Sequence, residues 1–380
     1  MTDAAAEPGP PPRCTMFGET RYSCFSVDTG DRLARQLAWS ARPGRKPFAP
    51  DHALIAARHV MVDDAALALI AENPDSYLMD KAGRPLIGFA SPSQYQAARA
   101  GFADGGGLTR LEDDGEGRFI RTLRRRAMPM VIDLREVPAR RAEKMVFDST
   151  YKGVTDIITA KLWPWPAFHV TRLLARLGIG PNPVTCVGII LTFLAAWLFA
   201  RADWGWALAA AWLMTFLDTV DGKLARATVS STRFGGWLDH ANDVIHPPLW
   251  WACVAYGLLA EPGGEPDRAV LISLGVIALF YLLGRISEVR FHLSFGFNQF
   301  LWTPFDSALR RVISRRNIIL LILSVGALLH RVDRAFEAAA LWCAVSIGLQ
   351  CIRWMQAEAT RLAGRPVENW MEARQDAQPG

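Results

Sequence analysis

The sequence predicts an α-helical integral membrane protein with six transmembrane helices, preceded by a small soluble α/β domain. Long apolar runs dominate the chain from Pro183 onward, whereas the part before it is mixed and more polar. Within residues 46–147, short apolar runs alternate with helical patterns, which is typical of an α/β fold. The 380 residues leave room for both parts.

The N-terminal part begins with a segment for which we predict no fixed structure, residues 1–45. Its first residues, MTDAAAEPGPPPRC, contain no basic segment followed by an apolar one, so they do not resemble a secretory signal. The pattern of the α/β domain that follows, 46–147, predicts strands at 53–62, 76–80, 85–91 and 128–134, helices at 63–73 and 91–102, and an exposed glycine-rich loop at 103–117.

An arginine-rich stretch, residues 118–128, ends this domain. It is interpreted either as a solvated helix face or as a surface for anionic lipid headgroups. It lacks the interleaved aromatic residues typical of nucleic-acid binding, and the net charge of +5 does not indicate a nucleic-acid partner.

Residues 148–180 lead into the membrane part. Trp163, Trp165 and Phe168 interleave there with Lys161 and Arg172, which favours an interfacial juxtamembrane helix lying against the bilayer. An ordinary amphipathic helix of the soluble domain is the alternative.

The membrane domain, residues 181–360, is expected to contain six apolar helices, and a polar tail, 361–380, follows it. The expected helices are Pro183–Ala200, Trp204–Arg226, Phe234–Ala260, Ala269–Glu288, Asn317–His330 and Ala335–Met355. Arginines gather after the fourth helix, whereas the loop EPGGEPDR on the other side is acidic on balance. The positive-inside rule therefore predicts an inner (cytoplasmic) membrane protein whose N-terminal domain faces the cytoplasm. Arg315 and Arg316 are interpreted mainly as membrane anchors.

The six cysteines form no C-x-x-C pair, and four of them lie in apolar runs. We therefore expect buried free thiols rather than disulfides or a zinc site.

Four aspartates, Asp218, Asp221, Asp239 and Asp243, lie at the facing ends of the second and third apolar helices. A charge at the centre of a bilayer costs about 2.5–3.5 kcal/mol, so four carboxylates at a membrane edge require compensation. Antiparallel neighbouring helices would bring them to one depth, on the cytoplasmic side. Carboxylates without a cysteine cluster favour hard cations, Mg²⁺ or Mn²⁺.

Small residues accompany these aspartates. Gly222, Ala225 and Gly235 would let a ligand approach the backbone closely, and Arg226 adds a positive charge suited to phosphate oxygens.

The pattern Asp218-x2-Asp221-Gly222-x2-Ala225-Arg226-x8-Gly235-x3-Asp239-x3-Asp243 resembles the signature of the CDP-alcohol phosphotransferase family. The segment PNPVT, Pro181 to Thr185, is similar to the motif before that family's first helix.

The resemblance implies a six-helix, usually dimeric membrane enzyme. It would transfer a substituted phosphate from a CDP-linked donor to an alcohol and release CMP in phospholipid biosynthesis. By the same resemblance, Asp218, Asp221 and Asp239 would hold two metal ions on the CDP diphosphate. Asp243 would be the general base and would also reach the second ion, and the small residues would line the cytidine pocket.

Arg285 and Glu288 resemble an Arg-x2-Glu pattern of relatives that use a phosphorylated polyol acceptor. Arg285 is therefore a candidate for binding the acceptor phosphate, with a membrane anchor as the alternative. His240 and His246 are expected to be hydrogen-bonding residues rather than substrate contacts, and Pro247 and Pro248 are expected to kink the third helix.

The front domain resembles the sugar-nucleotidyltransferase-type domain that is fused to some relatives. It lacks a glycine-rich L-x-x-G-x-G-x-R phosphate loop near its start. We therefore expect a degenerate, regulatory or scaffolding domain.

Two other classes of function use membrane carboxylates: intramembrane prenyltransferases and ion transporters. The transferase is favoured because all four aspartates lie in one window with spaced small residues. The sequence leaves its substrates open. A CDP-diacylglycerol donor with a polar acceptor such as inositol phosphate, and a CDP-polyol donor with a lipid acceptor, fit the same aspartates. The other expected partners are membrane lipids and a second copy of the chain.

Overall fold

The computed structural model describes residues 12–40, 48, 49, 51–80, 82–112, 117–121, 123–260 and 267–373. It divides into two compact units. The N-terminal unit consists of Met1–Tyr151 together with Arg172–Ile179 and Lys223–Ser230. The helical unit consists of Lys152–Thr171, Gly180–Gly222 and Ser231–Gly380.

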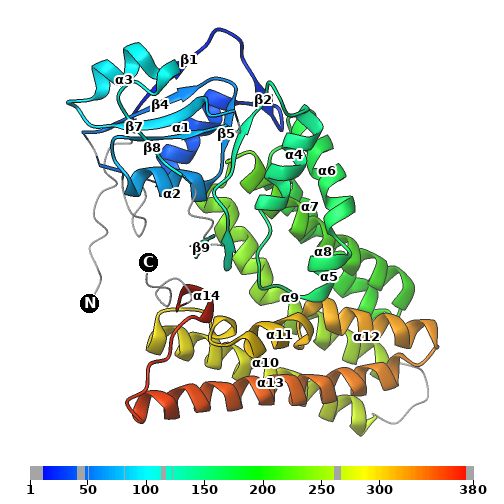
Figure 1. The fold of residues 1–380 in the computed structure, drawn as a ribbon. Helices are drawn as coiled ribbons and strands as arrows, with labels where there is room; N and C mark the ends of the chain where they lie inside the picture. The colour runs from blue at the N-terminus through cyan, green and yellow to red at the C-terminus, as the bar shows by residue number, and fades with distance from the viewer. Residues whose placement is uncertain are drawn as a thin grey trace. The chain divides into compact units, whose positions relative to one another are not determined.

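A five-stranded mixed sheet organises the N-terminal unit (Figure 1). Its strands, in spatial order, are β1 (Arg13–Phe17), β4 (Ala53–Ala57), β7 (Pro85–Ala90), β6 (Ser76–Met79) and β8 (Thr109–Arg110). The pairs β1–β4 and β6–β8 are parallel, and the pairs β4–β7 and β6–β7 are antiparallel.

Strand β4 is buried along its whole length because side chains cover both faces of the sheet. Leu54 and Ala56 belong to one apolar cluster, which includes residues of α1 (Thr29–Ser40) and α2 (Asp64–Glu72). Ile55 points the other way and belongs to a second cluster, with Ala98 of α3 (Tyr95–Gly101).

Shorter elements complete the unit. They are two hairpins, β2 (Ser23–Cys24) with β3 (Val27–Asp28) and β9 (Arg118–Ile120) with β10 (Arg125–Ala127), the antiparallel pair β5 (Val60–Val62) with β11 (Val131–Asp133), the 3-10 turn η1 (Phe102–Asp104), and helix α4 (Ala139–Ser149).

The structure corrects three sequence predictions for residues 1–147. Residues 12–40 contain β1 and α1, so the expectation of disorder over 1–45 is wrong there; residues 1–11 and 41–45 lie outside the described residues. The single strand predicted at 53–62 is two strands, β4 and β5, which pair with different partners. The helix face predicted within 118–128 is the β9–β10 hairpin, where Arg118 pairs with Glu72 at 2.9 Å.

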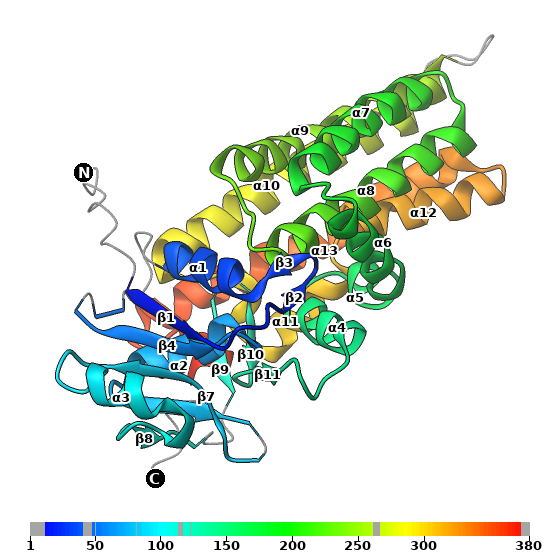
Figure 2. The same cartoon turned by 90° about the horizontal axis from the view of Figure 1, so that it is seen from above.

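The helical unit is built from α7 (Pro181–Ala200), α8 (Trp204–Ala227), α9 (Arg233–Leu259), α10 (Arg268–Phe295), α11 (Pro304–Val312), α12 (Arg316–Leu328) and α13 (Val332–Leu362). The short elements around them are α5 (Ile157–Lys161), α6 (Pro164–Arg176), η2 (Gln299–Leu301) and α14 (Trp370–Ala373). Helix α7 lies beside α9 (Figure 2), and α10 lies beside α13 (Figure 1). The single juxtamembrane helix predicted at 148–180 is therefore two helices, α5 and α6.

Among the residues that the structure describes, three helices are long and apolar enough to cross a membrane: α7, α10 and α13. Apolar side chains lie exposed on each of them, among them Ile190, Ile272 and Leu341. The structure thus has the features of a multi-pass membrane protein. Helices also form at the other three predicted positions, as α8, α9 and α12, and α12 has only 13 residues.

Buried polar side chains join α10 to α13. The Gln350 amide donates to the Gly284 carbonyl at 3.1 Å and to the Ser287 hydroxyl at 2.7 Å, and all three groups are buried. Such bonds hold helices together where apolar burial gives little driving force between them.

The six cysteines are free, as predicted. Cys24 and Cys343 are buried, Cys253 and Cys351 are half-buried, and Cys14 and Cys186 are exposed, so the prediction of burial is wrong for the last two.

Candidate functional site

Three aspartates of the predicted site converge in the helical unit. Asp218 lies on α8, and Asp239 and Asp243 lie one turn apart on α9. One carboxylate oxygen from each lies within 4.8 Å of those from the other two. This spacing is short enough for one divalent cation to be bound by oxygens from all three residues.

Arg316, the first residue of α12, supplies positive charge to this cluster. Its guanidinium donates to Asp218 Oδ2 at 2.6 Å and to Asp243 Oδ1 at 3.3 Å. The Arg316 side chain is 16% exposed and that of Asp218 is 20% exposed, so the bond between them is largely shielded from water. The interpretation of Arg316 mainly as a membrane anchor is therefore wrong, because its charged group lies on the carboxylates.

The fourth aspartate, Asp221, lies outside the group of three. It is 6% exposed, and its Oδ2 accepts a hydrogen bond of 2.6 Å from the Thr185 hydroxyl. Thr185 is the last residue of the PNPVT segment, which forms the start of α7. The segment identified by its motif thus fixes the orientation of a motif aspartate.

Gly235 lies at the first turn of α9, where Asn182 of α7 approaches the backbone. A Cβ atom at Gly235 would lie 2.5 Å from Asn182 Oδ1 and 3.0 Å from Thr232 Oγ1. The Thr232 hydroxyl also caps α9 by accepting from the Gly235 N–H at 2.9 Å. The absence of a side chain at Gly235 therefore permits this close approach of α7 to α9.

The remaining predicted nucleotide-binding residues follow in α8. Gly222 is the last residue of α8 that belongs to the helical unit. Ala225 and Arg226, in the last turns of α8, belong to the N-terminal unit. Arg226 donates from Nε to the Thr150 carbonyl at 3.1 Å. A role for these residues in binding CDP stays a prediction.

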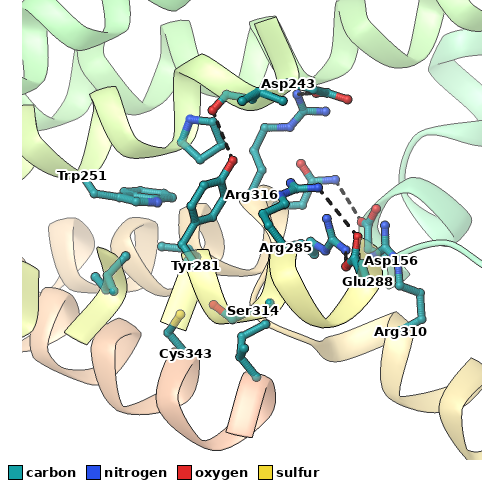
Figure 3. Close-up of a pocket in the computed structure, with 18 of the residues that line it drawn as sticks. Asp156, Asp243, Trp251, Tyr281, Arg285, Glu288, Arg310, Ser314, Arg316 and Cys343 are labelled. Carbon is teal, nitrogen blue, oxygen red and sulfur yellow. Dashed lines mark hydrogen bonds and ion pairs between the residues drawn. The ribbon is translucent and has the colours of Figure 1, made fainter. Parts of the chain in front are cut away.

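A cavity of about 190 Å³ opens beside Asp243 within the helical unit (Figure 3). Its charged lining includes Arg285, Glu288, Arg310, Arg315 and Arg316. Its apolar lining includes Trp251, Ile277, Ile319 and Ile347. The cavity therefore joins a cationic surface to an apolar one, with Asp243 on its wall.

Glu288 holds two of the cavity's arginines. Its carboxylate is hydrogen-bonded to Arg315, and its other oxygen lies 3.7 Å from Arg285 Nη1. The Arg285 guanidinium also lies 5.2 Å from the centre of the Tyr281 ring. Arg285, predicted from the Arg-x2-Glu pattern, thus lies in the same cavity as Asp243.

Asp156, before α5, anchors the start of α12. Its Oδ1 accepts from Asn317 Nδ2 at 2.9 Å, and its Oδ2 accepts from the Thr159 hydroxyl at 2.8 Å. Although burial acts to raise the pKa of Asp156, the hydrogen bonds from Asn317 and Thr159 hold it below its ordinary value. A charged Asp156 therefore fixes Asn317, the residue next to Arg316. No local sequence pattern indicates this pair, whose members lie 161 positions apart.

His240 and His246, the two histidines beside the motif aspartates, lie in different surroundings. His240 lines the cavity. His246 is 2% exposed, its Nδ1 lies 2.6 Å from the Asn242 carbonyl, and its ring packs edge-on against Trp250. The expectation of a hydrogen-bonding histidine agrees with this geometry for His246.

The part of the chain that carries these residues matches a known protein family. The family model described as CDP-alcohol phosphatidyltransferase matches residues 179–350. Residues 179–350 form a CDP-alcohol phosphatidyltransferase domain. The resemblance carried by the aspartate pattern is confirmed.

Curated relatives match shorter stretches. The archaetidylinositol phosphate synthase of Pyrococcus horikoshii is 40% identical over 78 residues, which are 20% of this chain and 42% of that protein. The phosphatidylinositol phosphate synthase of Mycobacteroides abscessus is 36% identical over 91 residues, 22% of this chain and 41% of that protein. The chain thus spans less than half the length of these relatives.

A solved structure also matches. The phosphatidylinositol phosphate synthase of Mycobacterium tuberculosis, with CDP-DAG bound, is 20% identical with a TM-score of 0.39, and the match covers 50% of this chain and 92% of that one. A structure of the same protein with manganese and citrate has the same identity and TM-score.

Replacing Thr185 tests how Asp221 is held. Thr185→Val keeps the shape of the side chain but removes the hydroxyl, leaving the buried Asp221 carboxylate without this donor. We expect Mn²⁺ affinity, measured by electron paramagnetic resonance titration of the purified protein, to fall about 10-fold or more. Thr185→Ser keeps the hydroxyl and should bind nearly as the wild type does. Equal affinities for Thr185→Val and the wild type would contradict this account.

Proposed function

We propose that this protein transfers a substituted phosphate from a CDP-linked donor to an alcohol and releases CMP. The observation that carries the proposal is the family match over residues 179–350, together with the convergence of three of its motif aspartates within 4.8 Å. The match favours this reaction over an intramembrane prenyltransferase or an ion transporter.

The donor set suits two divalent cations, Mg²⁺ or Mn²⁺. Asp218, Asp221 and Asp239 would hold them, and Asp243 would reach the second. All are hard oxygen ligands, and the described residues place no cysteine among them. When bound, the ions would neutralise the diphosphate of the donor and stabilise the oxygen displaced with CMP.

Asp243 is the residue that we assign as the general base. It lies on the wall of the cavity, at the edge of the carboxylate cluster, and its side chain is 49% exposed. An acceptor hydroxyl in the cavity could therefore reach its carboxylate and transfer a proton to it as the hydroxyl attacks phosphorus. Gly222, Ala225, Arg226 and Gly235 are the proposed contacts for the CDP moiety.

The cavity favours a phosphorylated polyol as the acceptor. Arg285, Arg310 and Arg315 line it with guanidinium groups, which bind phosphate oxygens well, and Glu288 holds Arg285 and Arg315. The two relatives named above are synthases of inositol phosphate lipids, which agrees with an inositol phosphate acceptor. We therefore propose CDP-diacylglycerol as the donor. If the product is a phospholipid and the acceptor is polar, the lipid part of the product has to come from the donor.

In the membrane, we propose that α7, α8, α9, α10, α12 and α13 all cross the inner membrane, with the aspartates near its cytoplasmic side and a second copy of the chain as partner. The arginines after α10 support this orientation through the positive-inside rule.

For the N-terminal unit, we propose a scaffolding role directed at α8. Arg32 and Arg35, one turn apart on α1, donate to the carbonyls of Ala227 and Thr228 at the C-terminal end of α8. A helix C-terminus carries partial negative charge, so two guanidinium groups stabilise it. Arg32 is 6% exposed, and its bond is therefore shielded from water.

A second set of contacts holds the same turn of α8. Lys223 lies over the Tyr151 ring, 2.8 Å from its centre, and Arg226 bonds the Thr150 carbonyl. Since α8 is continuous from Asp218 to these residues, holding its end restricts how the helix can rotate and shift. The α/β domain then supports the reaction without performing chemistry of its own.

Asp243→Asn tests the reaction and the base together. The change keeps the size of the side chain but removes its basicity, so we expect release of CMP from CDP-diacylglycerol, with inositol phosphate and Mg²⁺ present, to fall by at least about 100-fold. CMP is quantified by chromatography.

The matched control is Asp203→Asn, in the connection between α7 and α8, where the aspartate is 48% exposed and pairs with Arg201. It should retain activity. Full activity in Asp243→Asn would remove the base assignment, and no CMP from the wild type with either class of CDP-linked donor would overturn the proposed reaction.

Arg32→Met tests the scaffolding role. It keeps the apolar stem but leaves the Ala227 carbonyl without its buried donor, which should cost about 1–3 kcal/mol. We expect a lower midpoint of thermal unfolding in detergent and a lower rate of CMP release. Arg99→Met, at an exposed position of α3, is the control. If Arg32→Met behaves like Arg99→Met in both measurements, the N-terminal unit does not support α8 in this way.

A further inference from the structure

Two consecutive prolines interrupt the hydrogen bonds of α9 directly after the proposed base. Pro247 and Pro248 lie four and five residues beyond Asp243. In an α-helix the N–H of each residue bonds the carbonyl four positions earlier, and proline has no N–H. Neither the Asp243 carbonyl nor the Val244 carbonyl can therefore receive its usual helical hydrogen bond.

A side chain of the neighbouring helix supplies one of these missing bonds. Tyr281 of α10 donates from its hydroxyl to the Val244 carbonyl at 3.1 Å (Figure 3). The bond spans 37 positions of sequence and joins two helices that pack against each other. Tyr281 thus takes the place of the N–H that Pro248 lacks.

The same tyrosine also touches the cationic part of the cavity. Its ring lies 5.2 Å from the guanidinium carbon of Arg285, close enough for a cation–π contact. Asp243, Val244, Pro247, Tyr281 and Arg285 all line the cavity. One side chain therefore links the turn that carries the proposed base to the arginine that is proposed to bind the acceptor.

We propose that Tyr281 is a positioning residue. It holds the turn of α9 whose backbone hydrogen bonds the prolines interrupt, so that Asp243 faces an acceptor bound by Arg285. The proposal rests on the proposed function, because it needs Asp243 to act as a base. Its structural part, the replacement of a helical hydrogen bond by the tyrosine hydroxyl, does not depend on the reaction.

Tyr281→Phe removes the hydroxyl but keeps the ring, so the contact with Arg285 remains. We expect the kcat for CMP release to fall roughly 3- to 10-fold, with the KM for the CDP-linked donor unchanged. Tyr256→Phe, at an exposed position of α9, is the matched control and should keep the wild-type kcat.

Pro248→Ala provides the rescue. Alanine restores an N–H at position 248, and this N–H can bond the Val244 carbonyl in the helical way. In the Pro248→Ala background, Tyr281→Phe should therefore lower kcat less than twofold, whatever the activity of Pro248→Ala itself. The four proteins form a double-mutant cycle.

The thermal unfolding midpoint of the same four proteins is read in parallel. Tyr281→Phe should lower it by roughly 2–4 °C in the native background and by less in the Pro248→Ala background. Equal shifts in the two backgrounds would overturn the hydrogen-bond replacement.

Equal losses of kcat in the two backgrounds, or a shifted midpoint without any loss of kcat, would overturn the positioning role alone. A wild-type protein that releases no CMP overturns the proposed function and the positioning role with it, and the midpoints still decide on the hydrogen bond.

Discussion

The arrangement of the helical unit depends on the compensation of carboxylates that lie together between helices. Asp218, Asp239 and Asp243 bring three oxygens within 4.8 Å of one another, and like charges at such a distance repel strongly where water is scarce. The Arg316 guanidinium offsets this repulsion by bonding Asp218 and Asp243 at once. The position of α12 follows, because its first residue has to reach α8 and α9.

The residues on both sides of Arg316 are held as well. Asn317 follows Arg316 and is bound by Asp156, so the start of α12 is tied to the segment before α5. Arg315, on the other side, is bound by Glu288 of α10. Three consecutive residues thus contact four different parts of the helical unit. The cavity beside Asp243 lies among these contacts, which gives it both its cationic wall and its place next to the proposed base.

The spacing of the sequence was sufficient to predict that Asp218, Asp239 and Asp243 meet, since each pattern is local to one helix and the two helices are neighbours. It also predicted the helices α7 to α10, α12 and α13, and the strands β4, β6 and β7 of the five-stranded sheet. The roles of Arg316, Asp156 and Asn317 could not be predicted, because their partners lie 73 to 161 positions away in the sequence. No local pattern distinguishes such an arginine from a membrane anchor. Strand β1 could not be predicted for a similar reason. It is stabilised by pairing with β4, 40 positions later, rather than by a pattern of its own residues. The substrates and the number of metal ions stay predictions of the aspartate pattern and the family match.

The central claim is that the carboxylate cluster, whose charge Arg316 helps to balance, is a divalent-cation site. Crystals of the protein grown with and without Mn²⁺ test it by anomalous diffraction. The account predicts an Mn²⁺ peak about 2.0–2.2 Å from carboxylate oxygens of Asp218 and Asp239. The absence of any Mn²⁺ peak among the carboxylates at saturating Mn²⁺ would contradict it.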